Sequence, residues 1–166
     1  VLGESAGGHL ATMAAFEEPK LFGAVVGFYS PTNLVDLAEN STFVPEQIRD
    51  VLRNSGFAPL LRMHLKSLSP VEKVRPDAPP FLLLHGTSDP VVPESQSEEL
   101  QRRLKEAGVP CDLIVVKGGG HGLYYWDRFE PTVHWRSRAI EWLKANLNAP
   151  RQTPVADSLT HSPLAQ

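Results

Sequence analysis

The sequence predicts an α/β fold in which helices flank a parallel β-sheet. Two observations lead to this fold class. Short apolar runs alternate along the chain with segments of helical periodicity, and the runs are apolar at consecutive positions, as in parallel strands that are covered on both faces. With 166 residues, of which 42% are hydrophobic, the chain is long enough for one core of domain size.

The first elements are expected to be the end of a strand (1–2), a helix (7–16) and a central strand (22–29). In the helical segment Leu10, Met13 and Ala14 share one face at the 3.6-residue period. The strand is uninterrupted by polar residues until Ser30 and Pro31, which end it. This order predicts the start of a parallel sheet.

The second half repeats the alternation, with strands at 81–84 and 113–116 and helices at 94–107 and 133–147. The first of these helices carries Leu100, Leu104 and Ala107 on one side, and Gly108 follows as a helix-ending residue. The buried stripe expected on the last helix consists of Trp135, Ala139, Trp142 and Leu143. Both helices are therefore expected to pack against the sheet.

One domain is expected over residues 1–148, followed by a disordered tail at 149–166 that has almost nothing to bury. Residues 31–70 break the alternation, are too long for a plain loop and contain helix-like pieces at 46–53 and 60–65. We interpret them as a lid-like insertion over the carboxyl ends of the strands, where parallel sheets hold their ligands.

The composition excludes several classes of protein. Sixteen Lys and Arg residues against nineteen Asp and Glu give a net charge of −3, which disfavours a nucleic-acid-binding surface. No apolar run approaches the roughly 18 residues of a membrane span. Cys111 is the single cysteine, so neither an internal disulfide nor a cysteine-built zinc site can form.

The segment Gly3-Glu4-Ser5-Ala6-Gly7 matches the G-x-S-x-G pattern between a strand end and a helix. A sharp turn there would raise the serine hydroxyl above the sheet, and the flanking glycines would remove Cβ atoms that would otherwise collide. Ser5 is therefore the candidate nucleophile. The backbone N–H of Ala6, near the start of the helix, is the candidate oxyanion donor. For Glu4 we expect a structural or tuning role.

A serine nucleophile needs a base, and ideally a histidine that is held by a carboxylate. His121 lies in a glycine-rich segment directly after the strand at 113–116, and Asp89 follows the strand at 81–84. Ser5, Asp89 and His121 thus each follow a successive strand of the predicted sheet. We expect them to form one catalytic site, a Ser-Asp-His triad that needs neither cofactor nor metal ion.

Three segments, GESAGGHLA, PPFLLLHGTSDPVVP and VVKGGGHG, resemble the α/β-hydrolases, and within them the esterase/lipase branch and its acetyl- or feruloyl-type carbohydrate esterases. The resemblance implies a partial α/β-hydrolase fold, made of the end of the family's fifth strand and the three strands that follow it. The family's second oxyanion donor comes from an earlier HGG-type loop. We therefore expect a C-terminal fragment, whose open sheet edge would favour aggregation.

Two other groups of residues are candidates for the site: the remaining histidines near the motifs and the aromatic residues after His121. His9 and His85 are expected to be structural, and the spacing of His85, Asp89 and His121 disfavours a metal site. The aromatic residues Tyr124, Tyr125 and Trp126 either cover the last helix or line an acyl or sugar pocket.

The function expected from these features is hydrolysis of a carboxylic ester, with a small molecule or a carbohydrate as substrate. A serine peptidase of the prolyl-oligopeptidase type would use the same fold and triad. Ala6 followed by two glycines favours the esterase. A non-catalytic binding module with this fold is the third possibility, although such a protein usually lacks one member of the triad.

Overall fold

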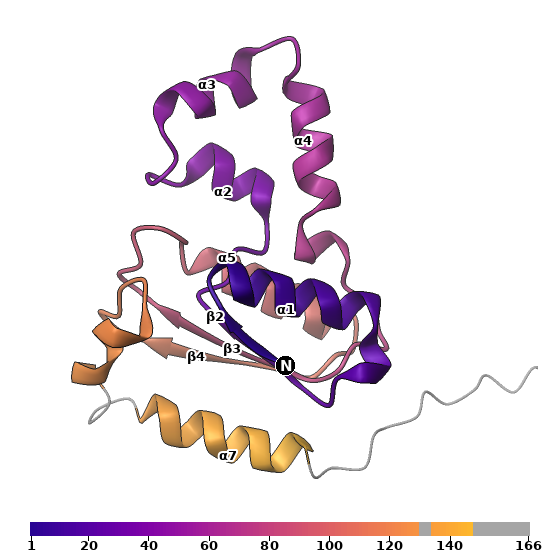
Figure 1. Cartoon of the computed structure of the whole chain (residues 1–166), viewed down its shortest axis with the longest axis vertical. Coiled ribbons are helices and arrows are strands. Elements are labelled where there is room, and N and C mark those ends of the chain that lie inside the picture. Colours follow the sequence, from indigo (N-terminus) through magenta and orange to yellow (C-terminus); the bar gives the residue numbers. More distant parts are fainter. Residues whose placement is uncertain (130–133, 148–166) are drawn as a thin grey trace, which may run out of the picture.

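The computed structural model describes residues 1–129 and 134–147 and shows a parallel sheet between helices (Figure 1). The strands are β1 (Leu2–Glu4), β2 (Val25–Phe28), β3 (Phe81–Gly86) and β4 (Cys111–Val116). The helices are α1 (Ala6–Glu17), α2 (Leu34–Asn40), α3 (Glu46–Asn54), α4 (Ala58–Ser67), α5 (Ser95–Glu106) and α7 (Trp135–Leu147). Short 3₁₀ helices lie at Pro19–Leu21, Pro70–Glu72 and Leu123–Phe129. The tail predicted at 149–166 lies outside the described residues.

The four strands lie in the order β1-β2-β3-β4, and every neighbouring pair is parallel. Strands that are adjacent in the sheet are therefore consecutive in the chain, with α1 between β1 and β2 and α5 between β3 and β4. This arrangement confirms the predicted parallel α/β fold. Because the strands run in the same direction, the loops after β1, β3 and β4 meet at one edge of the sheet.

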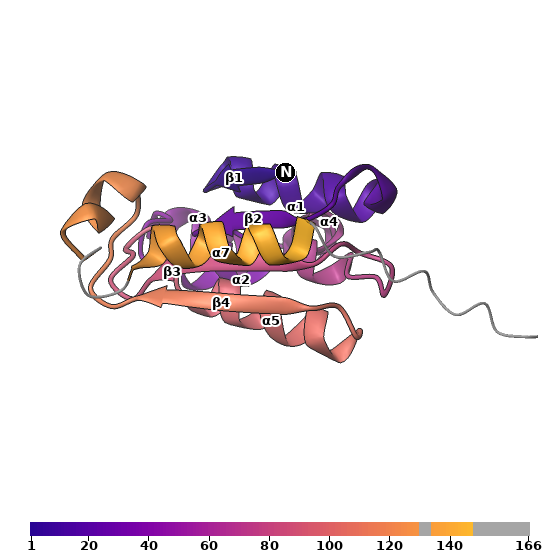
Figure 2. The same ribbon diagram turned by 90° about the horizontal axis from the view of Figure 1, so that it is seen from below.

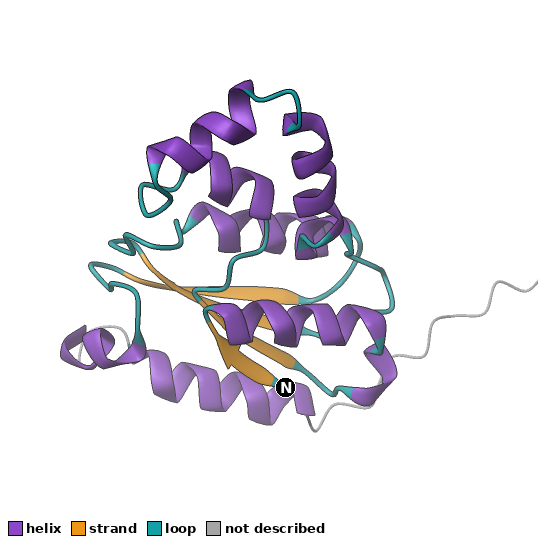
Figure 3. Ribbon diagram, turned by 45° about the horizontal axis from the view of Figure 1, so that its top comes forward, coloured by secondary structure: helices purple, strands orange, loops and turns teal. Residues whose placement is uncertain are grey.

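Helices cover both faces of the sheet, so that the chain forms three layers (Figures 2 and 3). Phe81 and Leu83 of β3 point to the face covered by α1 and α5. Leu82 and Leu84 point to the opposite face, which is covered by α7 and the 3₁₀ helix Leu123–Phe129. All residues of β2 and β3 are buried, which explains why these strands are uninterrupted apolar runs in the sequence.

The central strand β2 is shorter than predicted. It ends at Phe28 rather than at position 29, because Tyr29 has a φ of 39°, a left-handed conformation that no strand residue adopts. β3 and β4 extend beyond the predicted bounds, since their pairing starts at Phe81 opposite Cys111 and continues to Gly86 opposite Val116.

The face shared by Leu10, Met13 and Ala14 is not the buried face of α1. Leu10 is 66% exposed, whereas the buried face consists of Gly8, Ala11, Thr12, Ala15 and Phe16. Glycine, alanine and larger apolar residues together occur all around this helix, so its sequence period does not single out one face. The aromatic ring of Phe16 selects the face instead, because it packs against Phe81 of β3 at 5.5 Å between ring centroids.

The stripes predicted on the two other sheet-covering helices are confirmed. Leu100 and Leu104 of α5 are fully buried against one face of the sheet, and Trp135 and Ala139 of α7 are buried against the other. Trp142 and Leu143 are partly buried beside them. Among the described residues no helix is long and apolar enough to cross a membrane.

Helices α2, α3 and α4 form an arch that projects beyond the sheet (Figure 1). The two helix-like pieces of the sequence correspond to α3 and α4, whereas the short helix α2 was not predicted. Asn33 begins α2, since its side chain accepts a hydrogen bond from the N–H of Asp36 at 3.1 Å. The interpretation of residues 31–70 as a lid-like insertion stays a prediction.

The arch is attached to the sheet layers through the ends of α2. The buried side chain of Gln96 on α5 accepts hydrogen bonds from the N–H groups of Thr32 and Asn33, at 2.9 and 2.7 Å, and donates to Asp36 at 2.8 Å. Ser41, at the other end of α2, donates to the carbonyl of Val91 at 3.0 Å. By contrast, α3 and α4 pack mainly against α2 and each other.

Candidate active site

Ser5 lies at the turn between β1 and α1, with a φ of 50° and a ψ of −123°. A positive φ is uncommon for a residue with a Cβ atom and persists only where the surroundings enforce it. Two hydrogen bonds do so here: the Ser5 N–H donates to the carbonyl of Phe28 at 2.9 Å, and its own carbonyl accepts from the N–H of His9 at 3.0 Å. The strained turn directs the hydroxyl away from the strand.

Of the two glycines that flank Ser5 in the motif, one has the predicted role and the other does not. A Cβ atom on Gly3 would lie 2.3 Å from the carbonyl oxygen of Gly7, so Gly3 is required by close packing, as predicted. A Cβ atom on Gly7 would meet nothing within 4 Å, and the predicted collision there is wrong. The second tight position is Gly8, where a Cβ atom would lie 1.9 Å from the Ser30 hydroxyl oxygen.

Ser5, His121 and Asp89 are connected by hydrogen bonds, although they are far apart in sequence. His121 Nε2 lies 3.0 Å from Ser5 Oγ, and His121 Nδ1 lies 2.7 Å from Asp89 Oδ2. The carboxylate can only accept, so the ring proton is on Nδ1 and the lone pair of Nε2 faces the serine hydroxyl. In this arrangement the imidazole can receive the proton of Ser5.

The Asp89 carboxylate is fully buried and is held by three hydrogen bonds. Its Oδ1 accepts from the backbone N–H groups of Val91 and Val92, at 2.8 and 2.9 Å, while Oδ2 accepts from His121. The backbone therefore fixes the plane of the carboxylate, which leaves one oxygen directed at the imidazole. This geometry orients the ring and can stabilise a positive charge on it.

His85 supports the loop that follows β3 and carries Asp89, which we call the acid loop. It is fully buried, and its Nε2 donates to the carbonyl of Val92 at 2.8 Å, while Nδ1 accepts from the hydroxyl of Ser97 at 2.7 Å. Burial lowers the pKa of His85, which keeps the ring neutral 3.7 Å from Asp89 Oδ2. These contacts confirm the structural role expected for His85. His9 also has a structural contact, with the carbonyl of Pro31 at 3.1 Å.

The acid loop is attached to the histidine loop, the segment after β4 that carries His121. Gly118 donates its N–H to the Thr87 hydroxyl at 2.9 Å, and Ser88 donates its N–H to the carbonyl of Gly119 at the same distance. This approach is so close that a Cβ atom on Gly86 would lie 2.2 Å from that carbonyl oxygen. The glycines therefore permit the contact between loops as well as the bend that positions His121.

Ala6 is the first residue of α1, so its N–H has no partner within the ladder of helical hydrogen bonds. It follows Ser5 directly and is exposed. An N–H group at a helix start, next to the attacking oxygen, is suited to stabilise a developing negative charge. Ala6 thus lies at the start of α1, and its role as an oxyanion donor stays a prediction.

The three aromatic residues after His121 divide between the two roles considered for them. Trp126 is fully buried, donates to the carbonyl of Gly120 at 2.7 Å and packs edge-on against Trp135 of α7, so it belongs to the core and cannot contact a substrate. Tyr124 and Tyr125 are 86% and 55% exposed. Together with Asp127 and Arg128 they line a cavity of about 300 Å³.

Sequence reasoning did not identify Tyr29 as part of the site. Its ring lies beside the His121 imidazole, with 4.7 Å between ring centroids, and its hydroxyl bonds to Glu4. The signal for this residue was the strand pairing, because Glu4 pairs with Phe28, and Tyr29 is therefore next to the nucleophile turn.

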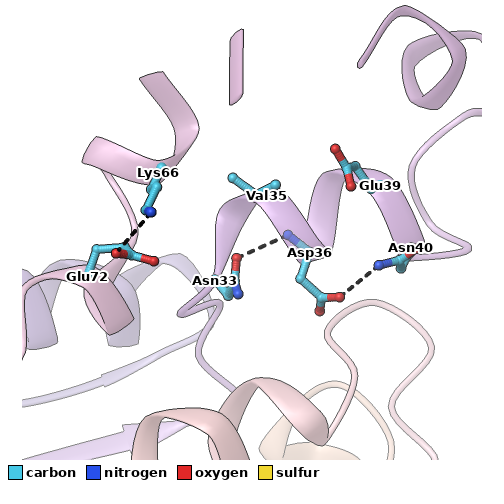
Figure 4. A pocket seen from close by; sticks show the side chains of 7 residues that line it. All are labelled: Asn33, Val35, Asp36, Glu39, Asn40, Lys66 and Glu72. Carbon is cyan, nitrogen blue, oxygen red and sulfur yellow. Dashed lines mark hydrogen bonds and ion pairs between the residues drawn. The ribbon is translucent and has the colours of Figure 1, made fainter. Parts of the chain in front are cut away.

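A second cavity of about 300 Å³ lies at the foot of the arch (Figure 4). It is lined by Asn33, Val35, Asp36, Glu39, Asn40, Lys66 and Glu72. Several of its polar groups are paired with each other: Asn40 donates to Asp36 at 2.8 Å, and Lys66 lies 3.7 Å from Glu72. In the part of the chain that the structure describes, no group of three His, Cys, Asp or Glu side chains could hold a metal ion.

A parallel sheet whose strand-to-helix turn carries the serine, with the acid and the histidine on later loops, is the arrangement of the α/β-hydrolase class. Within this class the chain belongs to the prolyl oligopeptidase family, whose model matches residues 1–150.

Individual relatives include both esterases and peptidases. The chain is 32% identical to esterase LipC of Mycobacterium tuberculosis over an alignment 155 residues long, which covers 81% of this chain and 37% of LipC. Among solved structures, acylaminoacyl peptidase of Pyrococcus horikoshii has a TM-score of 0.74 at 21% identity. The alignment covers 92% of this chain and 24% of that protein. The latter similarity shows the shared fold.

A third relative is the acetyl ester-xyloside bifunctional hydrolase from Caldicellulosiruptor lactoaceticus. It has a TM-score of 0.63 at 25% identity, and the alignment covers 87% of this chain and 55% of that protein. The chain thus spans about a third of the length of the curated esterase and about half of this hydrolase.

Proposed function

We propose that the protein is a serine hydrolase that cleaves carboxylic esters through an acyl-enzyme. The observation that carries this proposal is the hydrogen-bonded series Ser5–His121–Asp89, with 3.0 and 2.7 Å between the bonded atoms. A serine hydroxyl is a weak nucleophile by itself, and an imidazole with its lone pair on the serine side supplies the missing base.

In the first step Ser5 Oγ bonds to the ester carbonyl carbon while its proton passes to His121 Nε2. The N–H of Ala6 stabilises the oxyanion, and Asp89 stabilises the imidazolium. The C–O bond to the leaving group then breaks, and His121 gives its proton to the departing alcohol oxygen. In the second step His121 takes a proton from water, whose oxygen attacks the acyl carbon. The bond between that carbon and Ser5 Oγ then breaks, His121 returns its proton to Ser5 Oγ, and the carboxylic acid leaves.

The preference for esters is supported by the chain's relatives and by its nucleophile turn. LipC carries the name of an esterase, and Ala6, Gly7 and Gly8 after the serine resemble esterase motifs. The competing candidate is a peptidase. It is favoured by the family model, which describes prolyl oligopeptidases, and by a solved structure of an acylaminoacyl peptidase.

Within the ester hydrolases we propose an acylated carbohydrate as the substrate class. Tyr124 and Tyr125 follow the histidine loop, expose their rings and border a cavity, and sugar rings stack on such aromatic faces. The bifunctional hydrolase with a similar fold is named for acetyl ester and xyloside substrates. Buried Trp126 is left out of this contact surface.

The test uses the full-length gene product. A fluorophosphonate probe is expected to label Ser5, and Ser5→Ala and His121→Ala are expected to lower kcat for 4-nitrophenyl acetate by about 10⁶-fold, as in serine proteases. Absence of labelling, with the purified protein folded, would refute the serine hydrolase and favour a binding module. Faster turnover of aminoacyl 4-nitroanilides than of the ester would favour the peptidase.

The carbohydrate proposal has its own variant. Tyr124→Ala is expected to raise KM for an acetylated xyloside several-fold and to leave KM for 4-nitrophenyl acetate unchanged, because only the sugar would stack on the ring. An equal change for both substrates would contradict a sugar-specific contact.

A further inference from the structure

Tyr29 connects the strand of the nucleophile to the loop of the histidine. It follows β2 directly, is 1% exposed and has the unusual φ of 39°. Its own N–H donates to the carbonyl of Leu84 at 2.8 Å, which holds this conformation at the sheet edge. A buried tyrosine in a left-handed conformation is unfavourable locally, so contacts of the side chain must compensate.

The hydroxyl of Tyr29 makes two hydrogen bonds whose directions are determined by their partners. The N–H of Leu123 can only donate, and it does so to the Tyr29 oxygen at 3.2 Å. The Glu4 carboxylate can only accept, so it receives the proton of the phenol. Burial, followed by the contact with Glu4, raises the pKa of Tyr29 well above its usual range, and the hydroxyl therefore stays protonated.

The ring of Tyr29 fills the space between the histidine and the core. On one side it lies 4.7 Å from the His121 ring, and on the other it meets Trp126 edge-on at 5.4 Å between centroids. The Tyr29 ring thus flanks the His121 imidazole and is itself supported by the buried indole of Trp126. Rotation of the imidazole toward this side is blocked.

The loop around His121 needs such support because it is rich in glycine. Gly118 and Gly122 have φ values of 78° and 119°, which glycine adopts easily, and other residues rarely do. Before His121 the loop is tied to the acid loop through Gly118 and Gly119. After His121, the hydrogen bond from Leu123 to Tyr29 ties it to the sheet.

We propose that Tyr29 and Glu4 are positioning residues: together they form a bridge from the residue before the nucleophile to the loop of the base, and this bridge holds the His121 imidazole in register with Ser5. The inference rests on the proposed function of the triad. It assigns Glu4 a role without proton transfer to the substrate, since its carboxylate is engaged by the phenol.

A purely structural tyrosine would contribute to stability but not to the rate of the chemical step. The decisive readout is therefore the separation of kcat from KM, measured with 4-nitrophenyl acetate on the full-length protein. Tyr29→Phe keeps the ring and removes both hydrogen bonds of the hydroxyl. We expect kcat to fall about 10- to 100-fold with KM within twofold, because small displacements of a catalytic group have effects of this size.

Glu4 provides variants that do not threaten the core, because this residue is exposed. Glu4→Gln retains an acceptor for the phenol and is expected to keep kcat within about threefold of wild type. Glu4→Leu removes the acceptor, and kcat is expected to fall as in Tyr29→Phe. In the double variant Glu4→Leu/Tyr29→Phe, kcat is expected to fall no further than in either single variant, since both substitutions break the same bridge.

Ser69→Ala is the matched control. The buried hydroxyl of Ser69 also accepts from one backbone N–H, that of Leu34 at 2.9 Å, and donates to one further acceptor, the carbonyl of Leu65 at 2.8 Å. Its loss is expected to destabilise folding without changing kcat. If Tyr29→Phe and Ser69→Ala behave alike, with kcat unchanged, the positioning role is overturned while the triad stands. If wild type is inactive and unlabelled, the proposed function itself fails.

Discussion

The substitution Asp89→Asn tests the triad most sharply, because the structure dictates how the new side chain would lie. Both backbone N–H groups that face Oδ1, from Val91 and Val92, require an acceptor. The amide oxygen of asparagine must therefore take this place, and the amide nitrogen is directed at His121 Nδ1.

An amide nitrogen can only donate, so Nδ1 would have to accept and the ring proton would move to Nε2. That proton would point at Ser5 Oγ, 3.0 Å away, and the ring could no longer receive the serine proton. The same change in a serine protease lowers kcat about 10⁴-fold, which corresponds to about 5.4 kcal/mol. We expect a loss of this size here.

The assay is steady-state hydrolysis of 4-nitrophenyl acetate by the full-length protein, with urea unfolding as a second measurement. Folding should be affected little, because both backbone hydrogen bonds are retained. Asp112→Asn is the control: Asp112 accepts from Trp142 at 2.7 Å, which the asparagine oxygen can still do, and kcat should not change. A loss of less than tenfold for Asp89→Asn would refute the assigned role of the carboxylate.

Three further predictions concern stability and reactivity. Gly8→Ala should lower the free energy of unfolding by about 1–3 kcal/mol, because its Cβ atom would overlap the Ser30 hydroxyl. Gly7→Ala should be neutral or stabilising by up to about 1 kcal/mol, because its Cβ atom would meet nothing. Urea unfolding measures both free energies, and equal values for the two variants would contradict the prediction. Because burial lowers the pKa of His85 from 6.5, the unfolded chain binds more protons below that pH, so stability should fall as the pH drops through 6.5, and His85→Gln should reduce this dependence; an unchanged pH profile would contradict it. Burial raises the pKa of Cys111 to about 12, so a thiol reagent at pH 8 should modify the chain only after unfolding, and rapid modification of folded protein would disprove this.

The sequence predicted the parts of the fold that depend on uninterrupted burial. β2 and β3 are central strands and appear as apolar runs, and α5 and α7 show their buried stripes because one side of each faces water. The same reasoning could not identify the buried face of α1, because small apolar residues continue around the helix. It also missed α2, a short helix that is held by its Asn33 cap and by contacts with α5 rather than by its own periodicity.

For the candidate site, motifs predicted the three residues that the structure connects by hydrogen bonds, since each lies directly after a strand of a parallel sheet. Tyr29 escaped because nothing in its neighbourhood forms a motif, and its importance depends on strand order. The roles of Gly7 and Gly8 were not separable either. Which glycine is crowded depends on where Ser30 points, and this is a property of the packed structure.

The attachment of α2 has a consequence for the acid of the candidate triad. Ser41 at the end of α2 bonds to Val91, and Val91 in turn bonds to the Asp89 carboxylate. A change at the C-terminal end of α2 can therefore reach the acid through a single intervening residue, although the helix itself does not contact the triad.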